Sequence, residues 1–356
     1  MSKILYVAST ISHIKNFHLD YISALRNDGN EVLVMARGEG ADFNIPFEKK
    51  LLSAKNTKCR KEIRRILDRE KFDVVILNTS LAAFHVRLAM RKKKRPRCIN
   101  IVHGYLFNKQ GGLKDKILLF CEKILRKKTD ILILMNDEDM EISKKHKLSI
   151  EGGVMSLGMG ARCKDEVMAR DDIREQLGAR DKYVLTFVGE LSARKNQKML
   201  IDSLFEIKKS IPDVLLCLVG DGGAKAELKE RIRAQGLCKN VVFVGVRPNP
   251  CDFIRASDIY VSASKIEGMP FNIIEALGTK TPIVVSDIKG HRDLIRNGEN
   301  GYLFSLDNPC DFVSLVLDIH SGKKTVSTDA MLDTYLKYSF DNVFPKTYEI
   351  IKGAIK

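Results

Sequence analysis

Two glutamates eight positions apart, Glu267 and Glu275, are the residues whose types and spacing best suit a chemical site. The apolar alternation Asp258–Ser262 before them predicts a buried strand, and Phe271–Leu277 predicts a helix. Glu267 therefore falls on a loop at a strand's carboxyl end and Glu275 on the helix, with Pro270 suited to the first helical position. The unpaired N–H groups of that first turn favour an anion. Two carboxylates beside an anion site suit a ligand that has both hydroxyls and phosphates, such as a nucleotide sugar.

Two adjacent cations, Arg194 and Lys195, stand at a second strand-to-helix junction. Tyr183–Val188 is a β-rich run that ends at Gly189, and apolar residues at helical spacing follow from Met199. Because the start of a helix favours anions, two cations there need an anionic partner, and a diphosphate would bind both. The alternative is an ordinary pair of solvated side chains.

Both segments resemble motifs of retaining glycosyltransferases of the GT-B fold, family 4 type. Glu267-Gly268-Met269-Pro270-Phe271 through Glu275 resembles the Glu-x7-Glu motif, and Val188-Gly189-Glu190-Leu191-Ser192 through Gln197 resembles the donor-phosphate loop. The alternative for the first segment is a loop acid and a helix acid that share this spacing by chance.

The resemblance implies roles for these residues. Glu267 would contact the hydroxyls of the donor sugar and Glu275 the ribose. The backbone of Gly268, Met269, Pro270 and Phe271 would face the sugar and phosphates, beside Gly189. Many relatives have Arg where this chain has Glu190, so the phosphate contacts would depend on Arg194 and Lys195.

Two further segments resemble the family in the first half of the chain. Asn100–Phe107 resembles a strand-end segment with a His-Gly pair, which implies that His103 lies near the reacting sugar. The residues after the first strand resemble a form found in polysaccharide-type members. There His13 and Asn16 could face the acceptor or the donor phosphate, and could equally be loop or helix-cap residues.

Metal ligands are not expected. Asp137-Glu138-Asp139 has the spacing of a metal–nucleotide motif, but it follows Asn136 and suits the acidic first turn of a helix. The eight cysteines include no C-x-x-C pair, which argues against zinc and for reduced thiols in a cytosolic setting. The resemblance implies no metal and no cofactor, with the nucleotide sugar, UDP-linked, as a substrate.

Length and composition indicate a globular protein of two domains. The chain has 356 residues, of which 44% are hydrophobic and 29% charged. No stretch approaches the 18 apolar residues expected of a membrane span. The N-terminus leads directly into a strand, so no signal peptide is expected.

The positive charge is concentrated in one half. Residues 1–170 hold 34 Lys and Arg against 20 Asp and Glu, and the remaining residues hold 26 against 25, so the first half carries nearly all of the net +15. Basic clusters such as Arg91–Arg97 suit the anionic cytoplasmic surface of the cell membrane. Solvated helix faces are the alternative. Nucleic acid is not expected as a partner, because no reading motif accompanies the basic residues.

Strands and helices alternate along the whole chain, which predicts parallel sheets in an α/β fold. Together with the resemblance, this pattern predicts the GT-B architecture: an N-terminal Rossmann-like acceptor-binding domain at 1–160, a linker from Gly152 to Arg170, and a Rossmann-like donor-binding domain at 171–330. A helix within 331–356 is expected to pack back on the first domain. Predicted helices include Asn16–Asn27 and Ala82–Lys93.

The resulting hypothesis is a retaining transferase that moves a hexosyl or N-acetylhexosaminyl group from a UDP-sugar to a hydroxyl of a glycan or lipid-linked oligosaccharide in polysaccharide or capsule assembly. Glu267, His103, Arg194 and Lys195 would be its catalytic residues. Two alternatives stay open. One is a nucleotide-sugar 2-epimerase of the same fold, and the other is a non-catalytic basic protein that binds membrane or nucleic acid.

Overall fold

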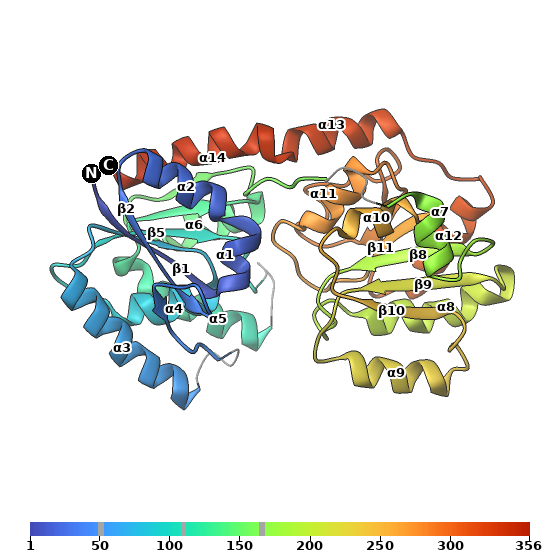
Figure 1. Cartoon of the computed structure of the whole chain (residues 1–356), viewed down its shortest axis with the longest axis horizontal. Helices are drawn as coiled ribbons and strands as arrows, with labels where there is room; N and C mark the ends of the chain where they lie inside the picture. The colour runs from blue at the N-terminus through green and yellow to red at the C-terminus, as the bar shows by residue number, and fades with distance from the viewer. Residues whose placement is uncertain (49–52, 108–111, 164–167) are drawn as a thin grey trace. The chain divides into compact units, whose positions relative to one another are not determined.

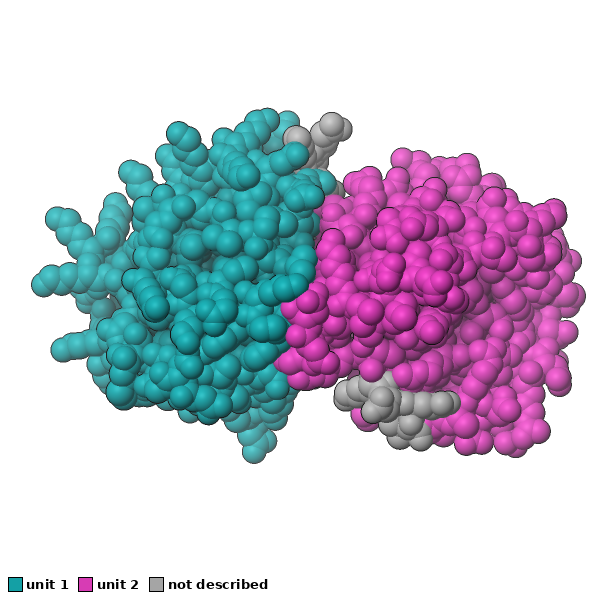
Figure 2. Space-filling view, turned by 90° about the horizontal axis from the view of Figure 1, so that it is seen from above, with its two compact units in different colours: residues 1–159, 343–356 teal, residues 160–342 magenta. Residues whose placement is uncertain are grey.

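The computed structural model describes residues 1–48, 53–107, 112–163 and 168–356. The chain divides into two compact units, coloured separately in Figure 2: unit 1 is residues 1–159 with 343–356, and unit 2 is residues 160–342. Each unit holds one wholly parallel sheet with helices on both of its faces (Figure 1). The predicted class, two doubly wound α/β domains, is confirmed.

Unit 1 contains a seven-stranded sheet in the order β3-β2-β1-β4-β5-β6-β7. Its strands are β1 (Lys3–Thr10), β2 (Glu31–Arg37), β3 (Phe43–Asn44), β4 (Val74–Leu77), β5 (Arg97–Val102), β6 (Ile131–Leu134) and β7 (Gly153–Met155). Its helices are α1 (Ile11–Phe17), α2 (Leu19–Asn27), α3 (Ala54–Glu70), α4 (Ser80–Ala89), α5 (Leu113–Leu125), the 3-10 turn η1 (Arg126–Lys128), α6 (Asp137–His146) and most of α14 (Phe340–Ile355).

Unit 2 contains a six-stranded sheet in the order β10-β9-β8-β11-β12-β13. Its strands are β8 (Tyr183–Val188), β9 (Val214–Val219), β10 (Val241–Gly245), β11 (Ile259–Ser262), β12 (Ile283–Ser286) and β13 (Tyr302–Phe304). Its helices are α7 (Arg170–Gln176), α8 (Gln197–Ser210), α9 (Lys225–Ala234), α10 (Pro250–Arg255), α11 (Phe271–Gly278), α12 (Pro309–His320) and α13 (Thr328–Tyr338).

Neighbouring residues of β8 reach opposite cores of unit 2, because side chains alternate across a strand. Leu185 belongs to one cluster with Leu204 of α8 and Phe312 of α12, whereas Val184 packs with Ile173 of α7. Both faces of the sheet are covered in this way, and the loops at the carboxyl ends of its strands are left to form a site.

Three predicted boundaries in unit 1 are wrong. The helix predicted over 16–27 is two helices, because His18 leaves the helical conformation (φ −128°, ψ −6°) between α1 and α2. The helix predicted over 82–93 ends at Ala89, since Met90 turns to extended backbone (ψ 143°). The predicted linker begins instead with a strand: Gly153–Met155 pairs with β6 as the seventh strand of the sheet.

The C-terminal tail is two helices rather than one. Ser339 between them is extended (φ −61°, ψ 150°), and the N–H of Phe340 donates to the Ala161 carbonyl within unit 2. Residues 343–356 group with unit 1, where Thr347 Oγ1 lies 2.7 Å from Ser156 Oγ. The chain thus returns to its first unit only along α14.

Candidate functional site

Glu267 lies on the loop between β11 and α11, at the carboxyl end of a central strand. The helix begins at Phe271. Pro270, predicted to be the first helical residue, is instead the extended residue directly before the helix (φ −80°, ψ 102°). Glu275 is the fifth residue of α11 and is half-buried. The backbone from Gly268 through Met269 and Pro270 to Phe271 therefore leads into a helix N-terminus, as predicted.

The loop after β8 brings two cations to the same edge of the sheet. Lys195 Nζ lies 2.6 Å from Glu267 Oε1, and Arg194 donates to Glu267 Oε2 at 3.0 Å and to the Ile266 carbonyl at 3.1 Å. The two loops are also joined through their backbones, since the N–H of Lys265 donates to the Arg194 carbonyl at 2.9 Å. Arg194, Lys195 and Glu267 form one charged cluster, which we call the ion cluster.

Glu267 and Lys195 are sheltered from water, each only 9% exposed, whereas Arg194 is half-buried. Burial acts to raise the pKa of its carboxyl, but Lys195 and Arg194, with a smaller contribution from His291, outweigh it and hold that pKa below its usual value. Glu267 is consequently ionised at neutral pH, and it can accept hydrogen bonds but not donate them.

Gln197, at the first position of α8, fixes the shape of the loop after β8. Its Nε2 donates to the Glu190 carbonyl at 2.8 Å, and its Oε1 accepts from the N–H of Ser192 at 3.2 Å. The beginning of α11 is tied to the same strand, since Asn272 Nδ2 donates to the Val188 carbonyl at 2.7 Å. The side-chain amides of Gln197 and Asn272 thus fix two segments next to the end of β8: the loop that carries the two cations and the turn that opens α11.

Gly220, at the end of β9, packs directly against Gly189 at the end of β8. A Cβ at Gly220 would lie 2.0 Å from the Gly189 carbonyl oxygen, and Gly220 has φ +139°, which L side chains rarely adopt. The N–H of Leu191 donates to the Asp221 carbonyl at 3.0 Å. Gly189, predicted to face the donor, is therefore held by backbone contacts in the floor of the site.

His291 was not identified from the sequence as a site residue. It is buried beyond the carboxyl end of β12, where its Nδ1 donates to the Ser286 carbonyl at 2.8 Å. Burial lowers its pKa to about 4, although Glu267 acts in the opposite direction, so the ring is neutral at pH 7. The sequence offers one signal for a site role of His291. It follows Gly290 shortly after a strand, and His103 and Gly104 form a similar pair, in the reverse order, after another strand.

Unit 1 gathers three histidines at the carboxyl ends of β1 and β5. One ring nitrogen each from His13, His18 and His103 lies within 4.8 Å of the other two. Tyr6 Oη lies 3.1 Å from His18 Nδ1. The structure thus brings His13 and His103 together and adds His18, which sequence reasoning did not select, while Asn16 lies exposed on α1.

The histidine cluster (His13, His18 and His103) is neutral. Burial lowers the pKa of His13 to about 4 and that of His103 to about 3, and it holds the pKa of His18 well below its ordinary value. The Nε2 atom of each ring is buried without a hydrogen-bond partner among the residues that the structure describes. Three neutral imidazoles could hydrogen-bond to sugar hydroxyls, and their donor set is also one that a transition metal ion accepts.

Asp137, Glu138 and Asp139 take no part in either cluster. They open α6, where Asn136 caps the helix by accepting from the N–H of Asp139. Asp139 is buried and accepts from the N–H of Tyr105 at 2.9 Å. The structural role expected for this acidic run is the one observed.

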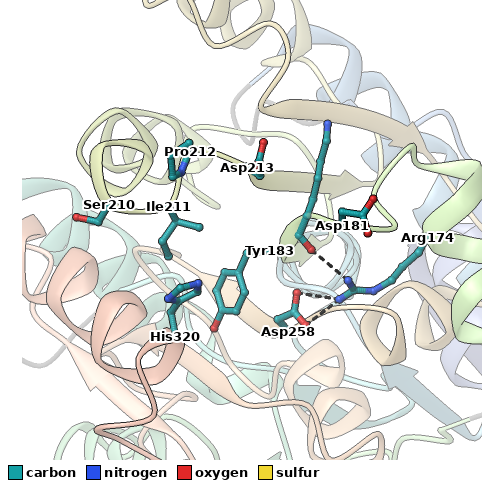
Figure 3. Close-up of a pocket in the computed structure, with 10 residues that line it drawn as sticks. Arg174, Asp181, Tyr183, Ser210, Ile211, Pro212, Asp213, Asp258 and His320 are labelled. Atoms are coloured by element: carbon teal, nitrogen blue, oxygen red, sulfur yellow. Dashed lines mark hydrogen bonds and ion pairs between the residues drawn. The ribbon is translucent and has the colours of Figure 1, made fainter.

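A hollow at the other end of unit 2 lies at the amino ends of β8 and β11 (Figure 3). Its wall includes Tyr183 and His320, and dashed lines in the figure join Arg174 to Asp258 and to the Lys182 carbonyl. Asp258 also accepts from the N–H of Val184 at 2.7 Å. The Arg174–Asp258 pair and its contact with the backbone of β8 are typical of a structural ion pair.

No helix in the described part of the chain has the length and apolar character needed to cross a membrane.

Two family models match the chain. Residues 16–145 match the model for Glycosyltransferase Family 4, and residues 169–329 match the model for Glycosyl transferases group 1. These are families of transferases, so neither the epimerase nor the non-catalytic alternative receives support.

Similar proteins cover most of the chain. A Bacillus subtilis (strain 168) protein named glycosyltransferase EpsD is 29% identical over 370 residues, which are 94% of this chain and 97% of the relative. The UDP-Gal:alpha-D-GlcNAc-diphosphoundecaprenol alpha-1,3-galactosyltransferase of Escherichia coli is 29% identical over 277 residues, 76% of this chain and 72% of the relative. The crystal structure of Anabaena HepE in complex with UDP and glucose has a TM-score of 0.79 at 20% identity, with 99% of this chain and 100% of HepE covered. This likeness confirms the GT-B architecture.

Proposed function

Because this chain belongs to the glycosyltransferases, with a family 4 part followed by a group 1 part, we propose that it moves a sugar from a nucleoside diphosphate sugar to a hydroxyl of a glycan or lipid-linked oligosaccharide, with retention of the anomeric configuration. The transferred group is a hexosyl or N-acetylhexosaminyl unit, and the reaction serves polysaccharide or capsule assembly. The name of the E. coli relative, which includes a diphosphoundecaprenol-linked GlcNAc, supports this class of acceptor.

The observation that carries the proposal is the ion cluster at the carboxyl ends of β8 and β11. As the bond from the sugar's anomeric carbon to the diphosphate breaks, negative charge grows on the leaving oxygen. Arg194 and Lys195, beside the amides that open α11, suit the stabilisation of that charge. The leaving phosphate takes the proton of the acceptor hydroxyl as the new bond to the anomeric carbon forms.

Glu267 and Glu275 hold the donor. Glu267 is ionised and accepts hydrogen bonds from the sugar hydroxyls, and Glu275 accepts from the ribose. The backbone from Gly268 to Phe271 lies against the sugar and the phosphates. These contacts hold the donor in a reactive orientation. Part of the entropy loss needed to reach the transition state therefore occurs on binding, which raises the rate.

His103, supported by His13, forms a hydrogen bond to a sugar hydroxyl near the reacting carbon. The neutral ring and the unpartnered Nε2 of His103 support this role. Asn16 is exposed on the same short helix and remains available to a phosphate of the acceptor or donor.

The donor carries UDP. Support comes from relatives: the E. coli relative is named for UDP-Gal, and HepE was crystallised with UDP. The charge that a divalent metal would supply comes from Arg194 and Lys195, and no metal or other cofactor takes part in the transfer.

The protein works at the cytoplasmic face of the cell membrane as a peripheral protein, without nucleic acid as a partner. The concentration of positive charge in residues 1–170 supports attraction to an anionic lipid surface, where each basic residue contributes about 1 kcal/mol.

A thermal-shift panel tests the donor site. UDP, GDP, dTDP, CMP and their common sugars are compared on wild type, on Lys195→Ala and on a control, Lys198→Ala, an exposed neighbour on α8. A ligand at a hundred times its dissociation constant stabilises the folded state by about 2.7 kcal/mol. UDP or a UDP-sugar should raise the melting temperature of wild type and of the control, and raise it less in Lys195→Ala.

Equal shifts in Lys195→Ala and wild type would contradict the assignment of the phosphate site, and a shift with another nucleotide alone would contradict the UDP donor. Retention is tested separately, by the NMR coupling constant of the anomeric proton in the first product. An inverted configuration would contradict the proposed mechanism.

A further inference from the structure

Helix α5 carries a line of exposed apolar side chains. Leu113, Ile117, Phe120 and Ile124 are 76%, 53%, 62% and 57% exposed. Their spacing of four, three and four residues places them on one side of the helix. We call these four residues the apolar strip. Large apolar side chains aligned in this way on a surface mark a contact with another apolar phase.

The apolar strip is not the core face of the helix. The opposite side of α5 packs against unit 1, since Leu125 is buried and Leu118 contacts the neighbouring core. Glu122 accepts from both terminal nitrogens of the buried Arg87 at 2.8 Å. These contacts fix the rotation of α5 about its axis and hold the strip outward.

Cations border the apolar strip on both sides. Lys116 and Lys123, seven residues apart, lie along one border, and Lys114 lies on the other. Arg126 and Lys127 follow directly in η1 and are exposed. An apolar centre with basic margins has the pattern of a helix that lies in the plane of an anionic membrane surface.

A wider basic surface continues from the end of α5. Lys128 donates to the Met90 carbonyl at 2.6 Å, which anchors η1 to the basic loop after α4. Burial lowers the pKa of Lys128, and the nearby charges of Arg64, Lys92 and Arg95 lower it further. Cations from three separate segments thus gather around Lys128, just beyond the C-terminal end of α5.

We propose that α5 is the element that enters the membrane: the apolar strip inserts among the acyl chains of an anionic bilayer, and its bordering lysines reach the lipid phosphates. The proposal rests on the proposed peripheral location and adds which residues make the contact. An apolar strip without cations would suit a second protein, whereas basic margins on both sides are complementary to anionic lipid.

The absence of tryptophan from the chain allows a direct test. Phe120→Trp introduces a single fluorophore on the strip, and Phe205→Trp introduces one at a half-exposed position on α8 as the control. With vesicles of phosphatidylcholine and phosphatidylglycerol, the emission of the first variant should shift to the blue and be quenched by brominated acyl chains. The emission of the control should not change.

Vesicle co-sedimentation gives a second readout. The double variant Ile117→Glu and Phe120→Glu should bind these vesicles at least about tenfold more weakly than wild type, since both side chains leave the acyl region. Phe205→Glu should bind as wild type does. The UDP thermal shift, measured without lipid, should be the same in all of these proteins, so a failure of the donor site and a failure of membrane insertion are distinguished.

Three results would overturn the inference. They are equal vesicle binding by wild type and the double variant, an unchanged emission spectrum of Phe120→Trp, and wild-type binding to DNA with none to anionic vesicles. A concentration-dependent dimer that the double variant abolishes, with no vesicle binding by wild type, would show that the apolar strip instead contacts a second copy.

Discussion

Glu267 is a buried anion held between two cations, so its charge and its shape can be separated by substitution. Glu267→Gln keeps the shape but removes the charge that Lys195 and Arg194 pair with. We expect the transfer rate at saturating donor to fall by about 10²-fold or more, because the donor and the cations are both displaced. Rapid-quench single-turnover assays measure this rate.

The control for that experiment is Glu206→Gln, which removes an exposed glutamate of α8 that pairs only with Lys209 among the ion pairs described. It should retain the wild-type rate. A Glu267→Gln rate within threefold of wild type would contradict a role for its charge.

Buried neutral histidines make stability depend on pH. His13, His103 and His291 have pKa values of about 4, 3 and 4 when folded, below the ordinary value near 6.5 that they regain on unfolding. The unfolded chain therefore takes up protons first, and the stability is complete above about pH 6.5 and falls as the pH drops toward 4. Each histidine contributes up to about 1.4 kcal/mol per pH unit.

Urea unfolding at several pH values between 7 and 4 should show this decline, and His103→Gln should make it shallower by removing one of these buried groups. Parallel curves for wild type and His103→Gln would contradict the burial of a neutral ring at that position.

The residues of the ion cluster were predictable because each follows a recognisable strand at its carboxyl end. Arg194 and Lys195 are adjacent, whereas Glu267 lies far from them in sequence, and all three meet at one edge of a parallel sheet. His18 was missed because its neighbourhood is made by segments distant in the chain, such as Tyr6, and no local spacing reports it. For His291, the glycine before it near a strand's carboxyl end was the local signal, whereas its influence on Glu267 depends on segments distant in the chain.

At the scale of elements, the loop after β12 supports the turn that opens α11. Gly290 has φ +82°, and a Cβ there would lie 2.5 Å from the Gly268 carbonyl oxygen. Gly290→Ala should therefore displace the amides of this turn and raise the KM for the donor by about tenfold or more, because a misplaced site loses binding steeply. Steady-state kinetics with varied UDP-sugar measure the effect.

Gly298→Ala is the matched control, since Gly298 also has φ +82° but has no atom within 4 Å of the added Cβ. Both variants introduce the same backbone strain, but only Gly290→Ala displaces the turn that opens α11. An equal KM in the two variants would show that strain alone, and not contact with Gly268, accounts for the result.

The strands at the centre of each sheet were predictable, because apolar runs bounded by glycine or charged residues are typical of buried strands. The short edge strands β3 and β7 were not predictable. Phe43–Asn44 and Gly153–Met155 offer two and three residues of pattern, and both pair only because a partner strand is already in place. The break at His18 was not predictable either, because the residues on both sides of it are compatible with a single helix.

At the scale of the whole molecule, the proposed reaction needs no metal. Transfer should continue at the wild-type rate after dialysis against EDTA, because Arg194 and Lys195 supply the charge on the donor side. Loss of activity restored by magnesium or manganese would contradict this. Loss restored by zinc alone would point to the histidine cluster as a metal site, which metal analysis of His18→Ala would then test.

The return of the chain along α14 also has a consequence for synthesis. Unit 2 is continuous in sequence, whereas unit 1 is complete only when residues 343–356 are joined to residues 1–159. On a ribosome that adds about 5–20 residues per second, unit 1 waits roughly 10–40 seconds for its last helix. During that interval the groups that α14 covers, including Ser156 and the ring of Tyr21, stay open to solvent. The unit that begins first in the chain is therefore the one that finishes folding last.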